Sequence, residues 1–136
     1  MVYWEVMDSP IGEIEFAALE GELVYCASAR ESGSDMFDWL DKYLPDEKKI
    51  TRGKNKVLEE ATSQLEAFLL GESKKLDVPL KLIGTPFRIE VWQALRTIPF
   101  GETRSYGELA KQIGKPGGAR AIGQANNKNP ISYFVP

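Results

Sequence analysis

The first third of the chain alternates hydrophobic and polar positions with a period of two. Residues 12–19 set glutamates against Ile14 and Phe16, which is the pattern of a half-buried strand. Shorter stretches of the same kind at residues 2–7 and 23–29 lie on either side of it. Turn residues separate the three stretches, at Asp8-Ser9-Pro10 and at Glu20-Gly21-Glu22. The pattern predicts a β-meander.

Between residues 34 and 70 the hydrophobic period changes to that of helices. Residues 34–44 place Met36, Phe37, Leu40 and Leu44 on one face and end at Pro45. Residues 54–70 carry a core-facing stripe and stop at Gly71; the stripe is Val57, Leu58, Ala61, Leu65, Phe68 and Leu69. Residues 76–83 alternate again and are predicted to form a strand or an extended linker.

A third region begins near Gly84 and reads as three helices. Thr85 can cap the first of them with Pro86 at its first position, and its apolar face, which is Phe87, Val91, Leu95 and Ile98, ends at Pro99. Ser105 and Glu108 have the spacing of a capping box that opens a second helix. The turn Gly114-Lys115-Pro116-Gly117 leads to a last helix at residues 118–127. Two short helices joined by a glycine-bearing turn predict a helix-turn-helix.

The last helix is unusual because it has almost no side-chain bulk. Glycines and alanines occupy six positions of the turn and helix, namely Gly117, Gly118, Ala119, Ala121, Gly123 and Ala125. Each interior glycine costs about 1 kcal/mol of helix stability relative to alanine. A close approach to a DNA groove, with Arg120 entering the base stack, would explain this composition. Tight helix–helix packing with a solvated arginine is the alternative, and the local pattern leaves Tyr106 open between a phosphate contact and core packing.

The net charge of −3 conceals an uneven distribution. Residues 1–79 contain 9 basic and 17 acidic residues, whereas residues 80–136 contain 8 basic and 3 acidic ones. The balance is therefore −8 in the first part and +5 in the second. A basic C-terminal part is typical of a surface that docks on a phosphate backbone.

Reactive side chains are few. Cys26 is the single cysteine and falls within a predicted strand, where it is interpreted as a small buried hydrophobe. The absence of histidine removes Ser-His-Asp and Cys-His chemistry from these residues and makes a zinc site improbable. No apolar run reaches the roughly 20 residues of a membrane-spanning helix. The start of the chain lacks the positive charge of a secretory signal, so a cytoplasmic protein is expected.

Several motifs of the C-terminal part occur together in one order. They are Thr85-Pro86-Phe87, Val91-Trp92, Ile98-Pro99-Phe100-Gly101-Glu102-Thr103, Ser105-Tyr106, Ala119-Arg120-Ala121-Ile122-Gly123 and Asn129-Pro130-Ile131-Ser132. This series resembles the C-terminal domain of O6-alkylguanine-DNA alkyltransferases, the methylated-DNA–protein-cysteine methyltransferases. The preceding part resembles the ribonuclease H-like domain of the same family. The implied fold is α+β, with a ribonuclease H-like β-sheet domain at 1–83 and a winged helix-turn-helix-like DNA-binding domain at 84–136.

The resemblance implies roles for individual residues. The helix-turn-helix would enter the minor groove of double-stranded DNA that contains O6-alkylguanine, and Arg120 would fill the gap left by the flipped base. Tyr106 would press on the flanking phosphate. Other residues expected to approach DNA are Arg88, Ser105, Lys115, Gly118 and Ala119. Asn129 would tie the helix-turn-helix to the active-site loop, which includes Pro130, and Ser132, with Tyr133 as its neighbour, would lie where this loop lines the alkyl pocket.

The resemblance also implies where the nucleophile belongs. In the family a cysteine and then a histidine would follow Val135-Pro136, and that cysteine takes the alkyl group irreversibly. We therefore expect the nucleophile immediately after Pro136 and the native polypeptide to continue. No catalytic residue of this kind lies within the 136 residues. The implied protein is a monomeric DNA-repair enzyme without a cofactor.

Two other functions fit parts of the sequence. An alkyltransferase-like protein binds the lesion without repairing it, although such proteins usually consist of the C-terminal domain alone. A winged-helix transcription regulator would also contain a helix-turn-helix. Its recognition helix, however, needs hydrogen-bonding side chains to read the major groove, and glycine and alanine do not provide them.

Overall fold

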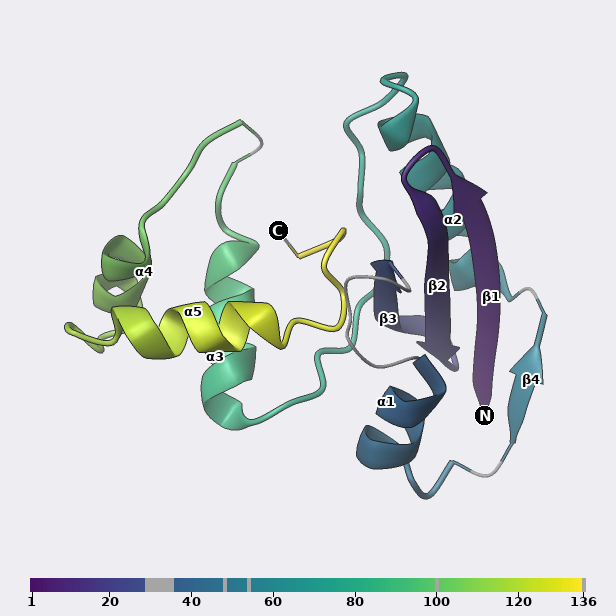
Figure 1. Ribbon diagram of the computed structural model, residues 1–136, viewed down its shortest axis with the longest axis horizontal. Coiled ribbons are helices and arrows are strands. Elements are labelled where there is room, and N and C mark those ends of the chain that lie inside the picture. The colour runs from purple at the N-terminus through teal and green to yellow at the C-terminus, as the bar shows by residue number, and fades with distance from the viewer. Residues whose placement is uncertain (29–35, 48, 54, 100, 136) are drawn as a thin grey trace. The chain divides into compact units, whose positions relative to one another are not determined.

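The computed structural model describes residues 1–28, 36–47, 49–53, 55–99 and 101–135. The chain forms two compact units (Figure 1). Unit 1 comprises residues 1–81 and 130–134, and unit 2 comprises residues 82–129 and 135–136. Residues 130–134 therefore pack with the N-terminal unit, although they follow the last helix in sequence. None of the described helices has the length and apolar composition needed to cross a membrane.

Unit 1 is formed around the predicted meander. Strands β1 (Val2–Ser9), β2 (Gly12–Leu19) and β3 (Glu22–Ser28) pair antiparallel in sequence order. The first turn is later than the sequence predicted, because Ser9 pairs with Gly12 and only Pro10 and Ile11 form the bend. The second turn is at Glu20-Gly21, where Glu20 adopts a φ of 53°. The predicted β-meander is confirmed.

A fourth strand, β4 (Ile50–Arg52), was not predicted from the sequence. It lies parallel to β1 at the sheet edge, which gives the strand order β3-β2-β1-β4. All three of its residues are exposed. A strand this short with no buried position has no alternation to detect, and only its pairing with β1 defines it.

One helix covers each face of the sheet. Paired residues point to the same face, so the row Trp4, Ala17 and Tyr25 faces one side. Helix α1 (Met36–Tyr43) covers this side: Phe37 meets the Trp4 ring edge-on at 5.0 Å between centroids, and Trp39 meets Tyr25 at 5.3 Å. Helix α2 (Lys56–Leu69) lies over the opposite face, where its residues line hollows together with Tyr3 and Met7.

Both predicted helices of this unit are present, with shorter bounds. In α2 the residues Val57, Leu58, Ala61 and Leu65 of the predicted stripe are buried. Asn55 caps this helix by accepting from the Leu58 amide at 2.9 Å, so the helix starts at Lys56, and the predicted start at residue 54 lies outside the described residues. Of the segment predicted as the first helix, residues 34 and 35 lie outside the described residues.

The free edge of β3 pairs with two distant segments. Around Leu23, the Leu23 amide donates to the Pro79 carbonyl and the Lys81 amide donates to the Leu23 carbonyl, at 2.8 and 2.9 Å. Residues 76–83 thus form an extended linker with one isolated bridge at Leu80. Further along, Ile131 forms a parallel bridge with Cys26. These pairings satisfy backbone groups that an open sheet edge would leave exposed.

Unit 2 contains the three predicted helices, α3 (Pro86–Leu95), α4 (Tyr106–Gln112) and α5 (Ala119–Asn127). The Thr85 hydroxyl caps α3 by accepting from the Arg88 amide at 3.2 Å. The Ser105–Glu108 capping box opens α4 as predicted. Helix α3 ends at Leu95, before Ile98, which the sequence placed on its apolar face. Ile98 lies in the turns that follow, because Pro99 disfavours helical backbone at the residue before it.

Trp92 is the centre of this unit. Its side chain is 1% exposed, and its indole N–H donates to the Ala125 carbonyl of α5 at 2.9 Å. Gly84 lies against the ring: a Cβ placed there would be 2.7 Å from Cη2 and 2.8 Å from Cζ3 of Trp92. The residue that begins the third sequence region is thus fixed as glycine by a tryptophan eight positions later.

Candidate DNA-binding surface and active-site loop

The turn between α4 and α5 depends on glycine. Gly114 and Gly117 adopt φ values of 75° and 85°, which side chains rarely tolerate. A Cβ at Gly118 would lie 3.0 Å from the Lys115 carbonyl oxygen, which also accepts the Gly118 amide at 3.1 Å. Lys115 and Gly118, two predicted DNA contacts, therefore lie together at the N-terminus of α5.

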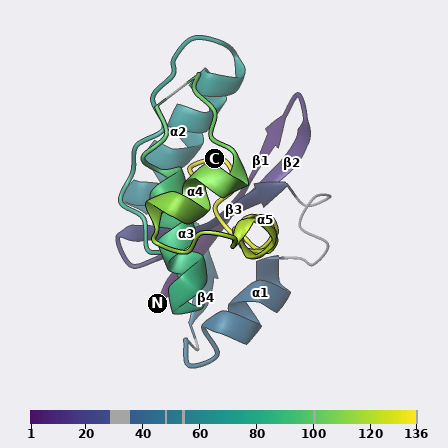
Figure 2. The same cartoon turned by 90° about the vertical axis from the view of Figure 1, so that its left-hand side faces the viewer.

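Helix α5 has a buried side and an open side. Ile122 and Ala125 are buried, whereas Arg120, Ala121 and Gln124 are exposed. Figure 2 shows this helix nearly end-on beside α4. Arg120 is the second residue of the helix, with half-buried Ala119 before it and exposed Ala121 after it. The predicted long cation among small residues is thus on the open side of the helix.

Gly123 has an intramolecular reason to lack a side chain. A Cβ there would lie 3.1 Å from Cε2 of Tyr106, so the tyrosine ring fits against the α5 backbone. This supports the packing alternative at one position. The small residues beside Arg120, in contrast, are not in that contact, and Ala121 is exposed. The packing explanation therefore applies at Gly123, and the approach of the residues beside Arg120 to a DNA groove stays a prediction.

The Tyr106 side chain is partly exposed and also contacts helix α5. It is the first residue of α4, follows the Ser105 cap, and is 43% exposed while its ring rests on Gly123. Its hydroxyl accepts a hydrogen bond from Asn126 Nδ2 at 3.4 Å. Sequence reasoning missed Asn126. The sequence indicates Asn126 only through its position three residues after Gly123, which places both residues on one face of the helix.

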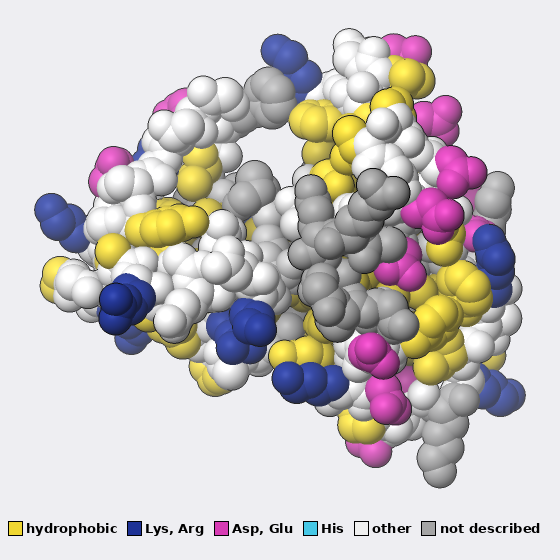
Figure 3. Space-filling model, viewed as in Figure 1, with side chains coloured by type: hydrophobic (Ala, Val, Ile, Leu, Met, Phe, Trp, Pro, Cys, Tyr) yellow, Lys and Arg dark blue, Asp and Glu magenta, His cyan; other side chains and the backbone are white. Residues whose placement is uncertain are grey.

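Basic side chains are exposed on and next to these two helices. Lys111, Lys115, Arg120 and Lys128 are all exposed, and dark blue side chains stand out over α4 and α5 in Figure 3. Arg88 is separate from them, as the third residue of α3, and is half-buried. The structure thus places five predicted DNA contacts, Tyr106, Lys115, Gly118, Ala119 and Arg120, along α4, the turn and the start of α5.

The predicted active-site loop is held by hydrogen bonds between its backbone and strand β3. Pro130 and Ser132 pair with Cys26 of β3: the Cys26 amide donates to the Pro130 carbonyl at 2.8 Å, and the Ser132 amide donates to the Cys26 carbonyl at 3.1 Å. Pro130 is buried, Tyr133 is half-buried and Ser132 is exposed. Within unit 2, Asn129 Nδ2 donates to the Val135 carbonyl. The predicted asparagine therefore bridges the two ends of the loop.

Cys26 lies under this loop and is fully buried. Burial raises the pKa of its thiol well above the usual range, because desolvation disfavours the thiolate. A thiol of this kind is a poor nucleophile. The interpretation of Cys26 as a buried hydrophobe agrees with the structure.

We expect Cys26 to resist thiol reagents while the chain is folded. Ellman's reagent should label the 136-residue chain at pH 7 to 9 only after addition of denaturant, since the thiolate forms only on exposure. Release of the reagent's chromophore measures the reaction. Fast labelling of the native chain at the rate of free cysteine would contradict the buried position.

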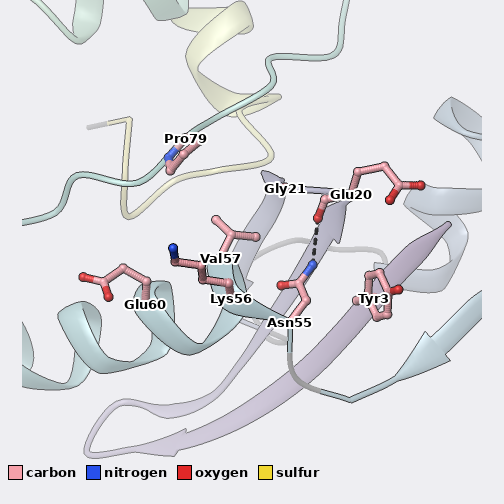
Figure 4. Close-up of a pocket in the computed structure, with 8 residues that line it drawn as sticks. All are labelled: Tyr3, Glu20, Gly21, Asn55, Lys56, Val57, Glu60 and Pro79. Carbon is pink, nitrogen blue, oxygen red and sulfur yellow. Dashed lines mark hydrogen bonds between the residues drawn. The ribbon is translucent and has the colours of Figure 1, made fainter.

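A hollow on the N-terminal unit contains none of the predicted site residues. It has a volume of about 570 Å³ and is drawn in Figure 4. Its lining is Tyr3, Glu20, Gly21, Asn55, Lys56, Val57, Glu60 and Pro79. Asn55 Nδ2 donates to the Glu20 carbonyl at 2.7 Å across its wall. Its polar groups carry mixed charges and do not converge on one point.

These features define an α+β protein in which a sheet domain precedes a helix-turn-helix DNA-binding domain. Two family models match the chain in the same order. The 6-O-methylguanine DNA methyltransferase, ribonuclease-like domain, matches residues 2–82, and the DNA binding domain of the same enzyme matches residues 86–136. The chain belongs to the methylated-DNA–protein-cysteine methyltransferase family.

Individual relatives agree with this assignment. The methylated-DNA–protein-cysteine methyltransferase of Methanosarcina acetivorans is 42% identical over 99% of this chain and 80% of its own length. That of Mycobacterium leprae is 42% identical over 100% of this chain and 76% of its own length. The crystal structure of Mycobacterium tuberculosis OGT in complex with DNA is 41% identical, with a TM-score of 0.80 over 98% of this chain and 74% of its own. The match thus includes both units.

Proposed function

We propose that this chain forms the DNA-binding surface and active-site loop of an enzyme that repairs O6-alkylguanine by direct reversal. The family assignment supports DNA repair by alkyl transfer to a protein cysteine. In the proposed reaction a cysteine thiolate next to Pro136 attacks the alkyl carbon. An S–C bond forms, the C–O6 bond breaks, and its electrons remain on the guanine, which takes up a proton. The protein is consumed because the thioether is not cleaved again.

The observation that carries the proposal is the arrangement of α4 and α5. Arg120 projects from the open side of a helix whose neighbouring residues are small, and Tyr106 stands half-exposed beside that helix. We propose that this surface enters the minor groove, that Arg120 occupies the space of the flipped base, and that Tyr106 contacts a phosphate. Lys115, Gly118 and Ala119 would contact the DNA backbone. Ser105 and Arg88 would lie at the margins of this contact surface.

The loop carries the second part of the proposal. Asn129 donates to the Val135 carbonyl, and the Cys26 backbone in β3 pairs with Pro130 and Ser132, so hydrogen bonds hold the described backbone that precedes Pro136. A positioned nucleophile reacts faster because its orientation is set before the substrate arrives. We propose that Ser132, with Tyr133 beside it, lines the alkyl pocket in a loop that includes Pro130, and that the domains divide near Gly84. We also propose that the protein is a monomer and lies in the cytoplasm.

The test is the intact mass of the purified protein before and after incubation with duplex DNA that contains one O6-methylguanine. A gain of one methyl group, mapped by peptide analysis to a cysteine that follows Pro136, is the expected result. The affinity for this duplex should also exceed that for the unmodified duplex. Preferential binding without any mass gain would show a lesion-binding protein instead. Equal affinity for both duplexes and an unchanged mass would contradict the proposal.

A further inference from the structure

We infer that Asn126 is a positioning residue that presets the Tyr106 hydroxyl as a donor to a DNA phosphate. The inference rests on the proposed function, since it concerns how Tyr106 would meet DNA. It starts from one contact: Asn126 Nδ2 donates to Tyr106 Oη at 3.4 Å. Tyr106 opens α4 and Asn126 lies in the last turn of α5, so the contact joins the two helices of the helix-turn-helix.

The position of the ring is set from a second side. The Tyr106 ring edge lies against the backbone at Gly123, where a Cβ would come within 3.1 Å. Gly123 and Asn126 are one helical turn apart, so they contact the ring and the hydroxyl from the same helix face. Tyr106 nevertheless remains 43% exposed. The side chain is therefore held at two points while its outer part stays accessible to a ligand.

The direction of the hydrogen bond decides what the hydroxyl can do next. A phenol has one proton to donate and can also accept. Because the Asn126 amide donates, the phenol oxygen is the acceptor in this contact and its proton remains available. Phosphate oxygens are acceptors without a proton at neutral pH. A hydroxyl whose proton is already free suits this partner, whereas one that donates to a neighbouring carbonyl or carboxylate would first have to break that bond.

The experiment is a double-mutant cycle on DNA affinity. We would measure dissociation constants of the 136-residue chain for a duplex with one O6-methylguanine, for wild type, Asn126→Ala, Tyr106→Phe and the double variant. Each single change should weaken binding about fivefold, the size of effect that one net hydrogen bond gives. The double variant should bind no more weakly than Tyr106→Phe, because Asn126 acts only through the hydroxyl.

Matched controls separate this role from general effects of α5. Asn127 is the exposed next residue, so Asn127→Ala should change affinity little and should do so equally in both Tyr106 backgrounds. Asn126→Asp should weaken binding more than Asn127→Asp, since both add one charge but only the former offers the phenol an acceptor. Thermal melting confirms that each variant is folded. Asn126→Ser, also too short to hold the contact, replaces Asn126→Ala if the alanine variant unfolds.

The outcomes distinguish the inference from the proposed function. Additive losses in the double variant, or an unchanged affinity of Asn126→Ala while Tyr106→Phe is weakened, would overturn the positioning role alone. An unchanged affinity of Tyr106→Phe would overturn it as well, because the hydroxyl would then have no role. A wild-type chain that shows no preference for the lesion duplex would instead contradict the proposed function.

Discussion

Replacing Arg120 by alanine should lower the affinity for DNA containing O6-methylguanine about ten- to a hundredfold. The expected size reflects the few kcal/mol needed to unstack a base, which an inserted side chain helps to offset. Arg120 is exposed on α5 between small residues, so its removal should leave the helix intact. Fluorescence anisotropy gives the affinity. The fluorescence of 2-aminopurine placed beside the lesion reports unstacking, and we expect its increase on binding to be lost in the variant.

The control must separate insertion from charge. Arg96, the exposed C-cap of α3, has no predicted contact with DNA, so Arg96→Ala measures the loss of one positive charge. Arg120→Lys keeps the charge but loses the planar guanidinium, and should recover only part of the affinity. If Arg120→Ala and Arg96→Ala weakened binding equally, the arginine would act only as a surface charge.

A single methyl group at residue 84 should destabilise unit 2. Gly84→Ala places a Cβ 2.7 Å from Trp92, and the buried ring, fixed by its hydrogen bond to Ala125, cannot move aside freely. Overpacking of this kind costs about 1–3 kcal/mol. Urea unfolding followed by Trp fluorescence measures the change in the free energy of unfolding.

Gly107→Ala is the matched control for this substitution. Gly107 lies inside α4, and a Cβ there would meet only the Ser105 hydroxyl, at 3.8 Å. We expect this variant to be as stable as wild type or more stable by up to about 1 kcal/mol, because alanine favours a helix over glycine. Equal effects of the two substitutions would show that the Trp92 ring yields to the added methyl group.

Sequence pattern predicted the parts of this fold that depend on local physics. The period-2 alternation of β2 and the apolar stripe of α2 each follow from a buried face, and the caps Thr85 and Ser105 follow from unpaired amides at helix starts. The pattern did not predict β4, whose definition lies in its parallel pairing with β1. It also could not pair Leu80 or Ile131 with β3, because those contacts join residues far apart in the chain.

The candidate site likewise has features that the sequence predicted and features that only the structure shows. The motifs placed Arg120, Tyr106 and Asn129 at positions where the structure gives each a specific setting. The role of Gly123 could not be settled from sequence, since a small residue suits both an external groove and an internal ring, and only the folded structure shows Tyr106 against it. The link from Asn126 to Tyr106 has the same origin: helix periodicity names the face, but not what lies opposite.

The pairing of residues 130–132 with Cys26 has a consequence for the order of folding. These hydrogen bonds join positions up to 106 residues apart, whereas the β1–β2–β3 meander closes through short turns. Closing a long loop costs more entropy than closing a hairpin, so the edge of β3 beside Cys26 should be completed last. During synthesis the sheet would form while the segment that covers this edge was still on the ribosome. The loop that leads to the expected nucleophile would thus reach its final backbone only after the meander has formed.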